Sequence, residues 1–517
     1  MIRVSLLVVL LFVVCAHAQS PAGTPAGSQA AAAFDPQQAR DVYVEALAFM
    51  APRILEPVPV SQLTVWGLRG LTALDPDLTA ALHDGALLLS NRGRRVAEIA
   101  APKDETPAAW ATAAVTLSGA GVGASALLRR AGTKGIIQAF FDELFNHLDP
   151  YSRYVAPSDA GPDRERRTGQ AGLGVTLARG SGPQIQVQSV ISESPAALAG
   201  VRMGDTITAV NGQAASGQDA GTIASLVAGP EGTSLTLSWR SRDGHLHTAA
   251  LVRTMVPPET VFSERAGDLL VIRITGFSHS SDLQLAHALQ DGLAAAAQPA
   301  GIVLDLRGNR GGLLRQAVTI SDTFLPEGIV AMAAGRDPDS NHIWRSSEGE
   351  LAEGIPLIEL VDGRSASAAE ILAAALADRG RAVVVGSSTL GKGLVQTIDP
   401  LPNGGELFVT WSRVLAPLGW PIQGLGVLPQ VCTSLGREAL GRQIAALSAG
   451  EQPMAEALRA DRTARAPLAP AQVVALRNVC PAAGGTDLDL DAARLLVRNP
   501  AAYAAAPRDG TAFRNRH

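Results

Sequence analysis

The spacing of apolar residues changes twice along the chain, and no other feature of the sequence constrains the fold as strongly. Residues 35–148 carry apolar side chains at the intervals of a helix. Residues 169–253 hold short β-prone runs separated by turns, which is typical of a small, mostly β module. From residue 269 to 431, strand-like and helical runs alternate, as in an α/β domain. Because 517 residues exceed the usual domain size of about 100–200 residues, we predict a multidomain α/β protein.

The first 18 residues have the pattern of a secretory signal peptide. Arg3 precedes an apolar run at residues 4–15, and Ala16-His17-Ala18 supplies the small residues typical of a cleavage site. The run is too short to cross about 30 Å of hydrocarbon as a helix, so we do not expect it to remain as a membrane anchor. We expect cleavage after Ala18 and a mature protein that is periplasmic or otherwise secreted, with no stable membrane span.

Changes in composition and spacing divide the chain into segments. They are a signal peptide (1–18), a flexible leader (19–34), an all-helical N-terminal region (35–165), a mostly β module (166–255), an α/β core (256–431) and a C-terminal extension with helical patches (432–517). Two stretches of the N-terminal region, 70–76 and 144–150, both end in Leu-Asp-Pro. Because proline disfavours helical geometry in the residue before it, we expect a helix to end at each of them.

Charge and composition exclude some broad classes of protein. Hydrophobic residues make up 47% of the chain, which is ample for buried cores, so disorder along the whole chain is excluded. Lys and Arg number 43 against 48 Asp and Glu, a net charge of −5, and the chain has no long basic run. We therefore expect no nucleic-acid partner.

Cys432 and Cys480 are the cysteines left after removal of the expected signal peptide, which contains Cys15. A secreted protein meets conditions that permit oxidation, so the two can form a disulfide. Closing a loop of about 49 residues would contribute roughly 4 kcal/mol to stability on the chain-entropy estimate. Two buried free thiols are the alternative that the sequence leaves open.

Ser367 opens a predicted helix and has two interpretations. Glu370 follows it at the spacing of a capping box, in which the serine side chain accepts a hydrogen bond from a backbone N–H of the first turn. Alternatively, Ser367 is a nucleophile, because the positive end of a helix dipole and its free N–H groups suit a developing oxyanion. A hydroxyl engaged as a cap is only partly compatible with nucleophilic attack.

A nucleophilic serine needs a base, and Lys392 is the better candidate. The nine histidines are scattered and form no recognisable Ser/His/Asp arrangement. Lys392 lies between Gly391 and Gly393, which allow close packing of the backbone. A free lysine has a pKa of about 10.4, so this lysine can serve as a base only if burial lowers its pKa. Gln396 is expected on the same face as Lys392 and can orient the amine by a hydrogen bond.

Four sequence blocks occur in the order of a known peptidase family. They are residues 305–312 (DLRGNRGG), 365–370 (SASAAE), 378–382 (DRGRA) and 389–396 (TLGKGLVQ). Through these blocks the chain resembles the carboxyl-terminal processing proteases, the S41 serine peptidases, from residue 144 to 431. It departs from the family pattern at Arg310, which replaces a usual proline before the glycine pair.

This resemblance implies roles for individual residues. It implies Ser367 as the nucleophile, Lys392 as the general base and Gln396 as the residue that orients the base. It also implies oxyanion-hole donors from the backbone amides of Ala368 and of Gly311 or Gly312. The implied mechanism is acyl transfer through an acyl-enzyme, and it needs no metal and no organic cofactor.

The mostly β module resembles a PDZ domain. The resemblance lies in Gly172-Leu173-Gly174-Val175 and in residues 194–207 (SPAALAGVRMGDTI). In such a module, the N–H groups of a Gly-x-Gly turn hold a terminal carboxylate, and the adjacent strand edge pairs with an extended peptide. The resemblance therefore implies peptide binding at these four turn residues, with a small or apolar C-terminal side chain preferred. A turn without a ligand is the alternative.

These patterns together predict a secreted or periplasmic serine endopeptidase with a Ser/Lys dyad. Its expected fold combines a helical N-terminal region, a small mostly β PDZ-like module, an α/β protease core and a helical C-terminal extension. Its expected partners are proteins or peptides with free C termini, and the sequence leaves open whether the chain forms a homo-oligomer. The alternative function is a catalytically inactive PDZ-containing peptide-binding or scaffold protein, in which Ser367 only caps a helix.

Overall fold

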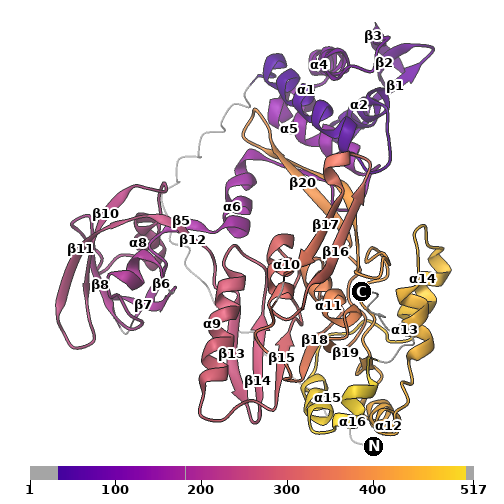
Figure 1. Cartoon of the computed structure of the whole chain (residues 1–517). Helices are drawn as coiled ribbons and strands as arrows, with labels where there is room; N and C mark the ends of the chain where they lie inside the picture. Colours follow the sequence, from indigo (N-terminus) through magenta and orange to yellow (C-terminus); the bar gives the residue numbers. More distant parts are fainter. Residues whose placement is uncertain (1–32, 181, 192, 348, 508–517) are drawn as a thin grey trace, which may run out of the picture.

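A computed structural model describes residues 33–507 except positions 181, 192 and 348, so the expected signal peptide and most of the leader lie outside the described residues. The N-terminal region, the mostly β module, the α/β core and the C-terminal helices follow one another along the chain (Figure 1). The expected multidomain α/β fold class is confirmed. Within the described residues, no helix has both the length and the apolar character that crossing a bilayer requires.

The N-terminal region packs helices and a small sheet around one core. Its elements are α1 (Pro36–Arg53), α2 (Val60–Arg69), α3 (Leu71–Leu74), β1 (Leu78–His83), β2 (Ala86–Asn91), β3 (Arg94–Ala100), α4 (Pro107–Ala124) and α5 (Ala126–Phe145). The region is helical as expected, but it also contains the antiparallel sheet β1-β2-β3, which the apolar spacing did not predict. Leu87 and Leu89 of β2 are buried in the same core as the helices.

A tight turn explains why the chain forms strands at this point. Asp84 and Gly85 both have positive φ values, 48° and 76°, and they join β1 to β2 with His83 opposite Ala86. Positive φ at both central residues is the geometry of a type I′ hairpin turn, for which Asp-Gly is a preferred sequence. A second turn of the same kind joins β2 to β3. The Asp-Gly pair was therefore the local signal for this hairpin.

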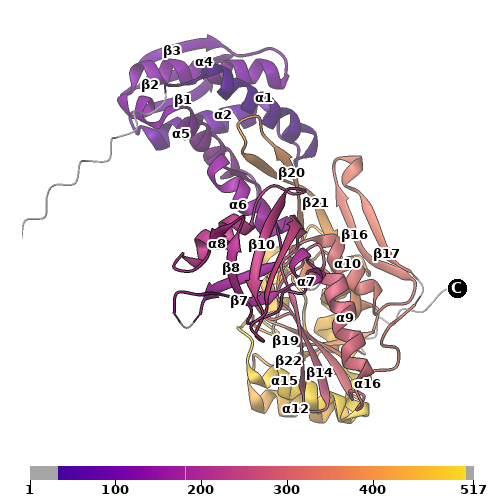
Figure 2. The same cartoon turned by 90° about the vertical axis from the view of Figure 1, so that its left-hand side faces the viewer.

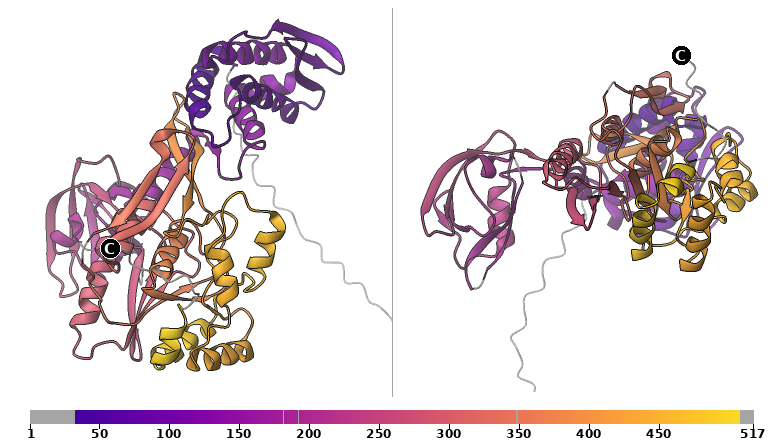
Figure 3. Two further views of the ribbon diagram at one scale, coloured as in Figure 1. Left: turned by 45° about the vertical axis from the view of Figure 1, so that its right-hand side comes forward. Right: turned by 60° about the horizontal axis from the view of Figure 1, so that its bottom comes forward.

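The PDZ-like module stands apart from the rest of the molecule, joined to it by a narrow connection (Figure 3). Its elements are β5 (Gln170–Gly172), β6 (Val175–Arg179), β7 (Ile185–Val190), α7 (Pro195–Leu198), β8 (Thr206–Val210), β9 (Gln213–Ala214), α8 (Ala220–Val227), β10 (Ser234–Arg240), β11 (Leu246–Val252) and β12 (Thr254–Val256). The main sheet has the order β11-β10-β8-β7-β6, which leaves β6 at an edge. Helix α8 contacts β6, and the short pair β5–β12 forms the connection.

The α/β core is built on a mostly parallel sheet of order β13-β14-β15-β18-β19-β22, in which only β13 is antiparallel to its neighbour. Its elements are β13 (Val261–Ala266), β14 (Leu269–Ile274), α9 (Ser281–Ala294), β15 (Gly301–Asp305), α10 (Leu314–Asp322), β18 (Leu357–Val361), α11 (Ala368–Asp378), β19 (Ala382–Gly386) and β22 (Val431–Cys432). Strands β15, β18 and β19 are buried along their whole lengths, as parallel strands covered on both faces should be. Helices α9, α10 and α11 pack on one face.

A second sheet forms an arm that reaches from the core to the N-terminal region (Figures 1 and 2). Its elements are β4 (Arg153–Val155), which belongs to the last part of the N-terminal region, and β16 (Gly328–Gly335), η1 (Pro338–Ser340), β17 (His342–Ser346), β20 (Leu394–Pro400) and β21 (Glu406–Leu415). The strand order is β17-β16-β21-β20, and β4 pairs with β21. Leu401, Leu407 and Val409 of the arm are buried in the apolar core of the N-terminal region. The two parts therefore share one core, and helix α6 (Pro157–Thr168) then leads to the PDZ-like module.

The C-terminal extension is helical and lies against the core on the side away from the PDZ-like module (Figure 3). Its helices are α12 (Arg437–Ser448), α13 (Ala455–Arg462), α14 (Pro470–Arg477), α15 (Asp487–Val497) and α16 (Pro500–Ala505). Helices α12, α15 and α16 cover the face of the central sheet opposite α11. Cys432 at the end of the sheet forms a disulfide with Cys480 of the extension, and both are buried. The extension thus completes the core.

Candidate active site

Ser367 sits at the start of helix α11 in a conformation that is unusual for its residue type. Its φ is 57° and its ψ is −117°, whereas residues other than glycine rarely adopt a positive φ. The helix that it opens is buried along its whole length, so the surrounding packing can hold this conformation. Strain of this kind is concentrated at functional sites, where it pre-organises a side chain.

The capping-box arrangement expected at Ser367 is present, although the serine hydroxyl itself makes no cap hydrogen bond. The backbone N–H of Ser367 donates to Oε2 of Glu370 at 2.8 Å. The N–H of Glu370, which would donate to the serine hydroxyl in a full capping box, donates at 2.8 Å to the carbonyl oxygen of Ser367. These backbone contacts hold the turn without requiring the hydroxyl as an acceptor.

Glu370 also holds the loop that carries the lysine. Its Oε1 accepts from the N–H of Gly391 at 2.6 Å and from the hydroxyl of Thr389, and its Oε2 accepts from the N–H of Lys392 at 2.9 Å. Burial raises the pKa of Glu370, and these hydrogen bonds oppose the rise. The spacing of Glu370 indicated only a cap, and its second role, joining the serine turn to the lysine loop, was missed. No local signal shows it, because Gly391 lies 21 residues away along the chain.

Lys392 is half-buried, and its Nζ lies 4.8 Å from the centre of the Tyr151 ring. Burial lowers the pKa of Lys392, and the positive charge of Arg153 lowers it further. The carboxylates of Glu370 and Asp149 act in the opposite sense but do not cancel these effects. A larger fraction of Lys392 is therefore neutral near pH 7 than of a free lysine, which is the condition for a general base.

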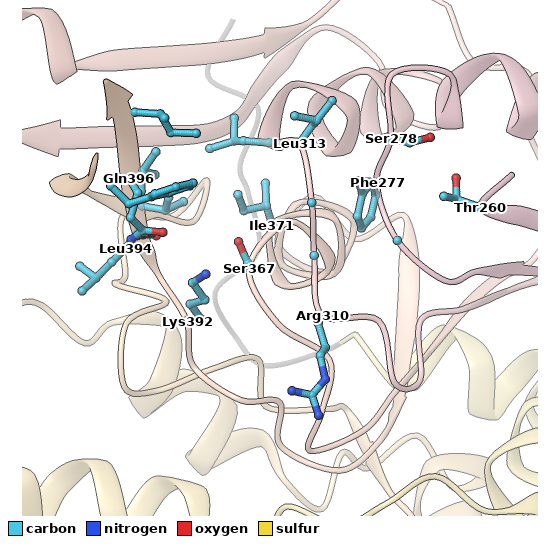
Figure 4. Close-up of a pocket in the computed structure, with 18 of the residues that line it drawn as sticks. Thr260, Phe277, Ser278, Arg310, Leu313, Ser367, Ile371, Lys392, Leu394 and Gln396 are labelled. Atoms are coloured by element: carbon cyan, nitrogen blue, oxygen red, sulfur yellow. Dashed lines mark hydrogen bonds between the residues drawn. The ribbon is translucent and has the colours of Figure 1, made fainter. Parts of the chain in front are cut away.

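Ser367 and Lys392 line one cavity of about 440 Å³. Figure 4 shows the lysine side chain pointing toward Ser367, with Ile371 beside the serine. Arg310, at the position where the family pattern has proline, lines the same cavity. Most of the other lining side chains are apolar: Phe277, Leu314, Leu394, Val395, Ile398, Phe408 and Val414. A cavity of this composition can take an extended peptide with apolar side chains.

The glycine pair lies directly beside the serine. A Cβ on Gly311 would stand 2.8 Å from the Cβ of Ser367, so only glycine fits there. The N–H of Gly311 donates to the side chain of Asn309 at 2.8 Å, which removes it as a donor to a substrate. Within the described part of the chain, the N–H groups of Gly312 and Ala368 have no acceptor. Of the two glycines that the sequence left open, Gly312 is therefore the better candidate for an oxyanion donor.

Gln396 lies on β20 and lines the same cavity as Lys392. Lys392 itself precedes the strand, and a bulge after Val395 places Gln396 opposite Thr410 of β21. The Nε2 of Gln396 donates to Oγ1 of Thr410 at 3.0 Å and to the carbonyl oxygen of Leu394 at 3.2 Å. The structure thus brings Gln396 to the cavity. Because of the bulge, strict strand alternation would not have predicted that Gln396 lies opposite Thr410.

The expected carboxylate-binding turn lies at the edge strand of the PDZ-like module. Gly172 ends β5 and Val175 begins β6, with Leu173 buried between them. Gly174 has a φ of 76°, and a Cβ there would stand 2.3 Å from Ser194. In the residues that the structure covers, the N–H groups of Leu173 and Gly174 have no protein acceptor. The turn therefore presents two donors beside the open edge of β6, as a carboxylate site requires.

Neither site contains a group of residues suited to a metal. Among the residues described, no three histidine, cysteine or acidic side chains gather where they could hold a metal ion. The polar groups of the cavity include the hydroxyl of Ser367, the amine of Lys392, the amide of Gln396, the guanidinium groups of Arg153 and Arg310, and backbone donors. This set is suited to nucleophilic attack on a carbonyl carbon and to stabilising the resulting oxyanion, which are the steps of acyl transfer.

Comparison with known proteins identifies the class. Residues 268–433 match peptidase family S41, and residues 186–241 match a PDZ domain. A carboxy-terminal-processing protease of Bartonella bacilliformis is 35% identical over 301 residues, which cover 57% of this chain and 69% of that protein. The carboxy-terminal processing protease CtpA of Bacillus subtilis is 33% identical over 305 residues, which cover 58% of this chain and 63% of that protein. The solved structure of a photosystem II D1 C-terminal processing protease is 25% identical, covers 74% of this chain and 97% of that chain, and has a TM-score of 0.37.

An S41 core preceded by a PDZ domain defines a class of serine-type peptidases. The serine and the half-buried lysine that line one cavity are consistent with this class. The chain belongs to the carboxy-terminal-processing proteases of family S41. The match with these two relatives extends over little more than half of the chain.

Proposed function

We propose that this protein is a periplasmic or otherwise secreted endopeptidase that cleaves proteins recognised by their C-terminal tails. Ser367 is the nucleophile and Lys392 is the general base. The observation that carries the proposal is that the strained serine and the lysine of lowered pKa line one cavity. The pattern of the first 18 residues supports secretion, and the disulfide between Cys432 and Cys480 suits an oxidising compartment.

The reaction follows from the positions of these groups. Neutral Lys392 takes the proton of Ser367 as Oγ attacks the scissile carbonyl carbon, and the oxyanion accepts hydrogen bonds from Gly312 and Ala368. The tetrahedral intermediate collapses to an acyl-enzyme, and the leaving amine receives the proton from Lys392. A water molecule then loses a proton to Lys392 and attacks the ester. As this second tetrahedral intermediate collapses, Lys392 gives the proton to Oγ of Ser367, and the new C terminus is released.

The pH dependence of cleavage tests this proposal. We expect an unfolded protein substrate to be cut at internal bonds, in the presence of a chelator, with kcat/KM rising as the pH is raised from about 6 to 9. The reason is that Lys392 must be neutral, and its lowered pKa puts the rise below the range of free lysine, about 10.4. Mass spectrometry of the fragments and initial rates give both readouts. Loss of activity in the chelator, or a rate that falls across this pH range, would contradict the mechanism.

Three features support tail recognition by the PDZ-like module. Strand β6 is an open edge, helix α8 lies alongside it, and the N–H groups of Leu173 and Gly174 lie at its start. A peptide that adds to β6 as a further strand would place its terminal carboxylate at these donors.

Affinity for matched peptides tests the tail proposal. We expect a peptide with a free apolar C terminus to bind the Ser367→Ala full chain about tenfold to a hundredfold more tightly than its amidated twin. The amide removes the charge and one acceptor, and a charge-assisted hydrogen bond contributes roughly 1.5–3 kcal/mol. Calorimetry measures both affinities. Gly174→Val should abolish the difference, because a Cβ at this position collides with Ser194. Equal affinities in the parent chain would exclude carboxylate recognition.

A further inference from the structure

The segment that follows helix α5 enters the active site, although it lies outside both matched regions of the sequence. It begins at the second Leu-Asp-Pro turn and continues into β4, which pairs with β21 of the arm. Tyr151 places its ring against the amine of Lys392, and Arg153 lines the catalytic cavity. The motif that predicted only the end of a helix therefore lies beside the proposed base.

Asp149 of this motif is bonded to the strand that faces Gln396. Its Oδ1 accepts from the hydroxyl of Thr410 at 2.7 Å, across 261 residues of sequence. The same carboxylate accepts from the N–H and the hydroxyl of Ser152, whose Oγ in turn accepts from the N–H of Thr410 at 2.9 Å. Thr410 is buried, so its hydroxyl cannot exchange these partners for water.

The chemistry of these groups gives the chain of hydrogen bonds a direction. An ionised carboxylate only accepts, so the single proton of the Thr410 hydroxyl is committed to Asp149. The Thr410 oxygen can then only accept from Gln396, which must present its NH2 group, and it does so at 3.0 Å. The second N–H of Gln396 is held by the carbonyl oxygen of Leu394. Both donors of the amide are thus engaged, and Oε1 of Gln396 is left as an acceptor in the cavity that Lys392 also lines.

We propose that Asp149 and Thr410 are positioning residues of this peptidase: they fix the Gln396 amide so that its oxygen accepts an N–H of Lys392 and leaves the amine lone pair for Ser367. The inference rests on the proposed Ser367–Lys392 mechanism. It also assigns a function to the end of the N-terminal region, which supplies Asp149 directly after α5. Without Asp149, the Thr410 hydroxyl is free to donate to Gln396, and the amide can turn its NH2 group toward the lysine.

Two substitutions at Thr410 test this orientation. Thr410→Val removes the hydroxyl but keeps the shape of the side chain. We expect kcat to fall about 10- to 100-fold, which is the usual cost of losing a residue that orients a functional side chain, and KM to change little. Thr410→Ser keeps the hydroxyl and should retain most of the activity. Steady-state kinetics on an unfolded protein, with thermal unfolding to verify the fold, measures both. A Thr410→Val enzyme with wild-type kcat would overturn the proposal.

The first Leu-Asp-Pro turn offers a matched control for Asp149. Asp75 is a hydrogen-bond acceptor as well, taking the hydroxyl of Ser125 and the N–H of Asp77, but it is buried and is not among the residues that line the cavity. Asp149→Ala should lower kcat as Thr410→Val does, whereas Asp75→Ala should leave the kcat of the folded enzyme unchanged. If both variants lower kcat equally, the effect is structural and the proposal fails. Should Asp149→Ala not fold, the two Thr410 variants decide.

A double variant shows whether Thr410 acts through Gln396. In a Gln396→Ala background, Thr410→Val should lower kcat no further, because the residue that it orients is already absent. Losses that multiply would overturn the proposal. Failure of the underlying mechanism would give a different result, since Ser367→Ala would then remain active. A dead Ser367→Ala enzyme together with a fully active Thr410→Val enzyme would refute the positioning role alone.

Discussion

Replacing Ser367 with alanine is expected to lower kcat/KM on an unfolded protein by about 10⁴-fold or more, because the variant lacks the oxygen that forms the acyl-enzyme. The fold should be unaffected. The contacts that hold the turn are made by the backbone of Ser367 with Glu370, and alanine keeps them. Alanine would adopt the same positive φ of 57° and carry the strain that serine carries now. The melting temperature should therefore change by only a few degrees.

Initial rates and thermal unfolding of the purified full chain give the two measurements. Ser158→Ala is a suitable control, because this serine is exposed on α6 and lies outside the cavity. The control should match the wild type in both measurements. Residual turnover by Ser367→Ala within tenfold of the wild type, in preparations free of contaminating protease, would show that another group attacks the carbonyl.

Replacing Lys392 with methionine is expected to lower kcat/KM by about 10³-fold or more, because Ser367 would have no base to take its proton. Methionine keeps most of the length and the apolar character of the side chain. The backbone N–H at position 392, which donates to Glu370, is retained as well. Loss of activity in this variant therefore reports the loss of the amine rather than a displaced loop.

Lys392→Arg separates a basic role from a merely positive charge. A guanidinium stays protonated at any pH that the protein survives, so it keeps the charge but cannot accept a proton. We expect this variant to be as inactive as Lys392→Met at every pH between about 6 and 10. An active Lys392→Arg enzyme would mean that position 392 supplies charge only, and the general base would have to be sought elsewhere.

Much of the candidate site could be predicted because its chemistry lies in short, contiguous blocks. Ser367 at a helix start and Lys392 between glycines are local patterns, and each occurs in a block of fewer than ten residues. The same holds for the turn Gly172–Val175. The choice between Gly311 and Gly312 could not be made from the sequence. It depends on the side chain of Asn309, which engages one N–H and leaves the other.

Glu370 and Asp149 illustrate what local patterns cannot show. Each has a correct local interpretation, the first as half of a capping box and the second as part of the turn that follows a helix. Each also makes a contact with a distant segment, Glu370 with the lysine loop and Asp149 with Thr410. A single side chain with two oxygens can serve both purposes, so a sufficient local explanation does not exclude a second role.

The sequence by itself determined the order of the parts, the helical and strand periodicity of most of them, and the pair of residues that we propose for acyl transfer. These features depend on neighbours along the chain, through side-chain spacing, caps and turns. Only the tertiary structure decided which N–H groups stay free for an oxyanion, which way the Gln396 amide faces, and that a turn from the N-terminal region borders the catalytic cavity. The pairing of β4 with β21 joins segments about 250 residues apart, and no local preference encodes such a contact. It forms because the arm and the N-terminal helices bury their apolar side chains in one shared core.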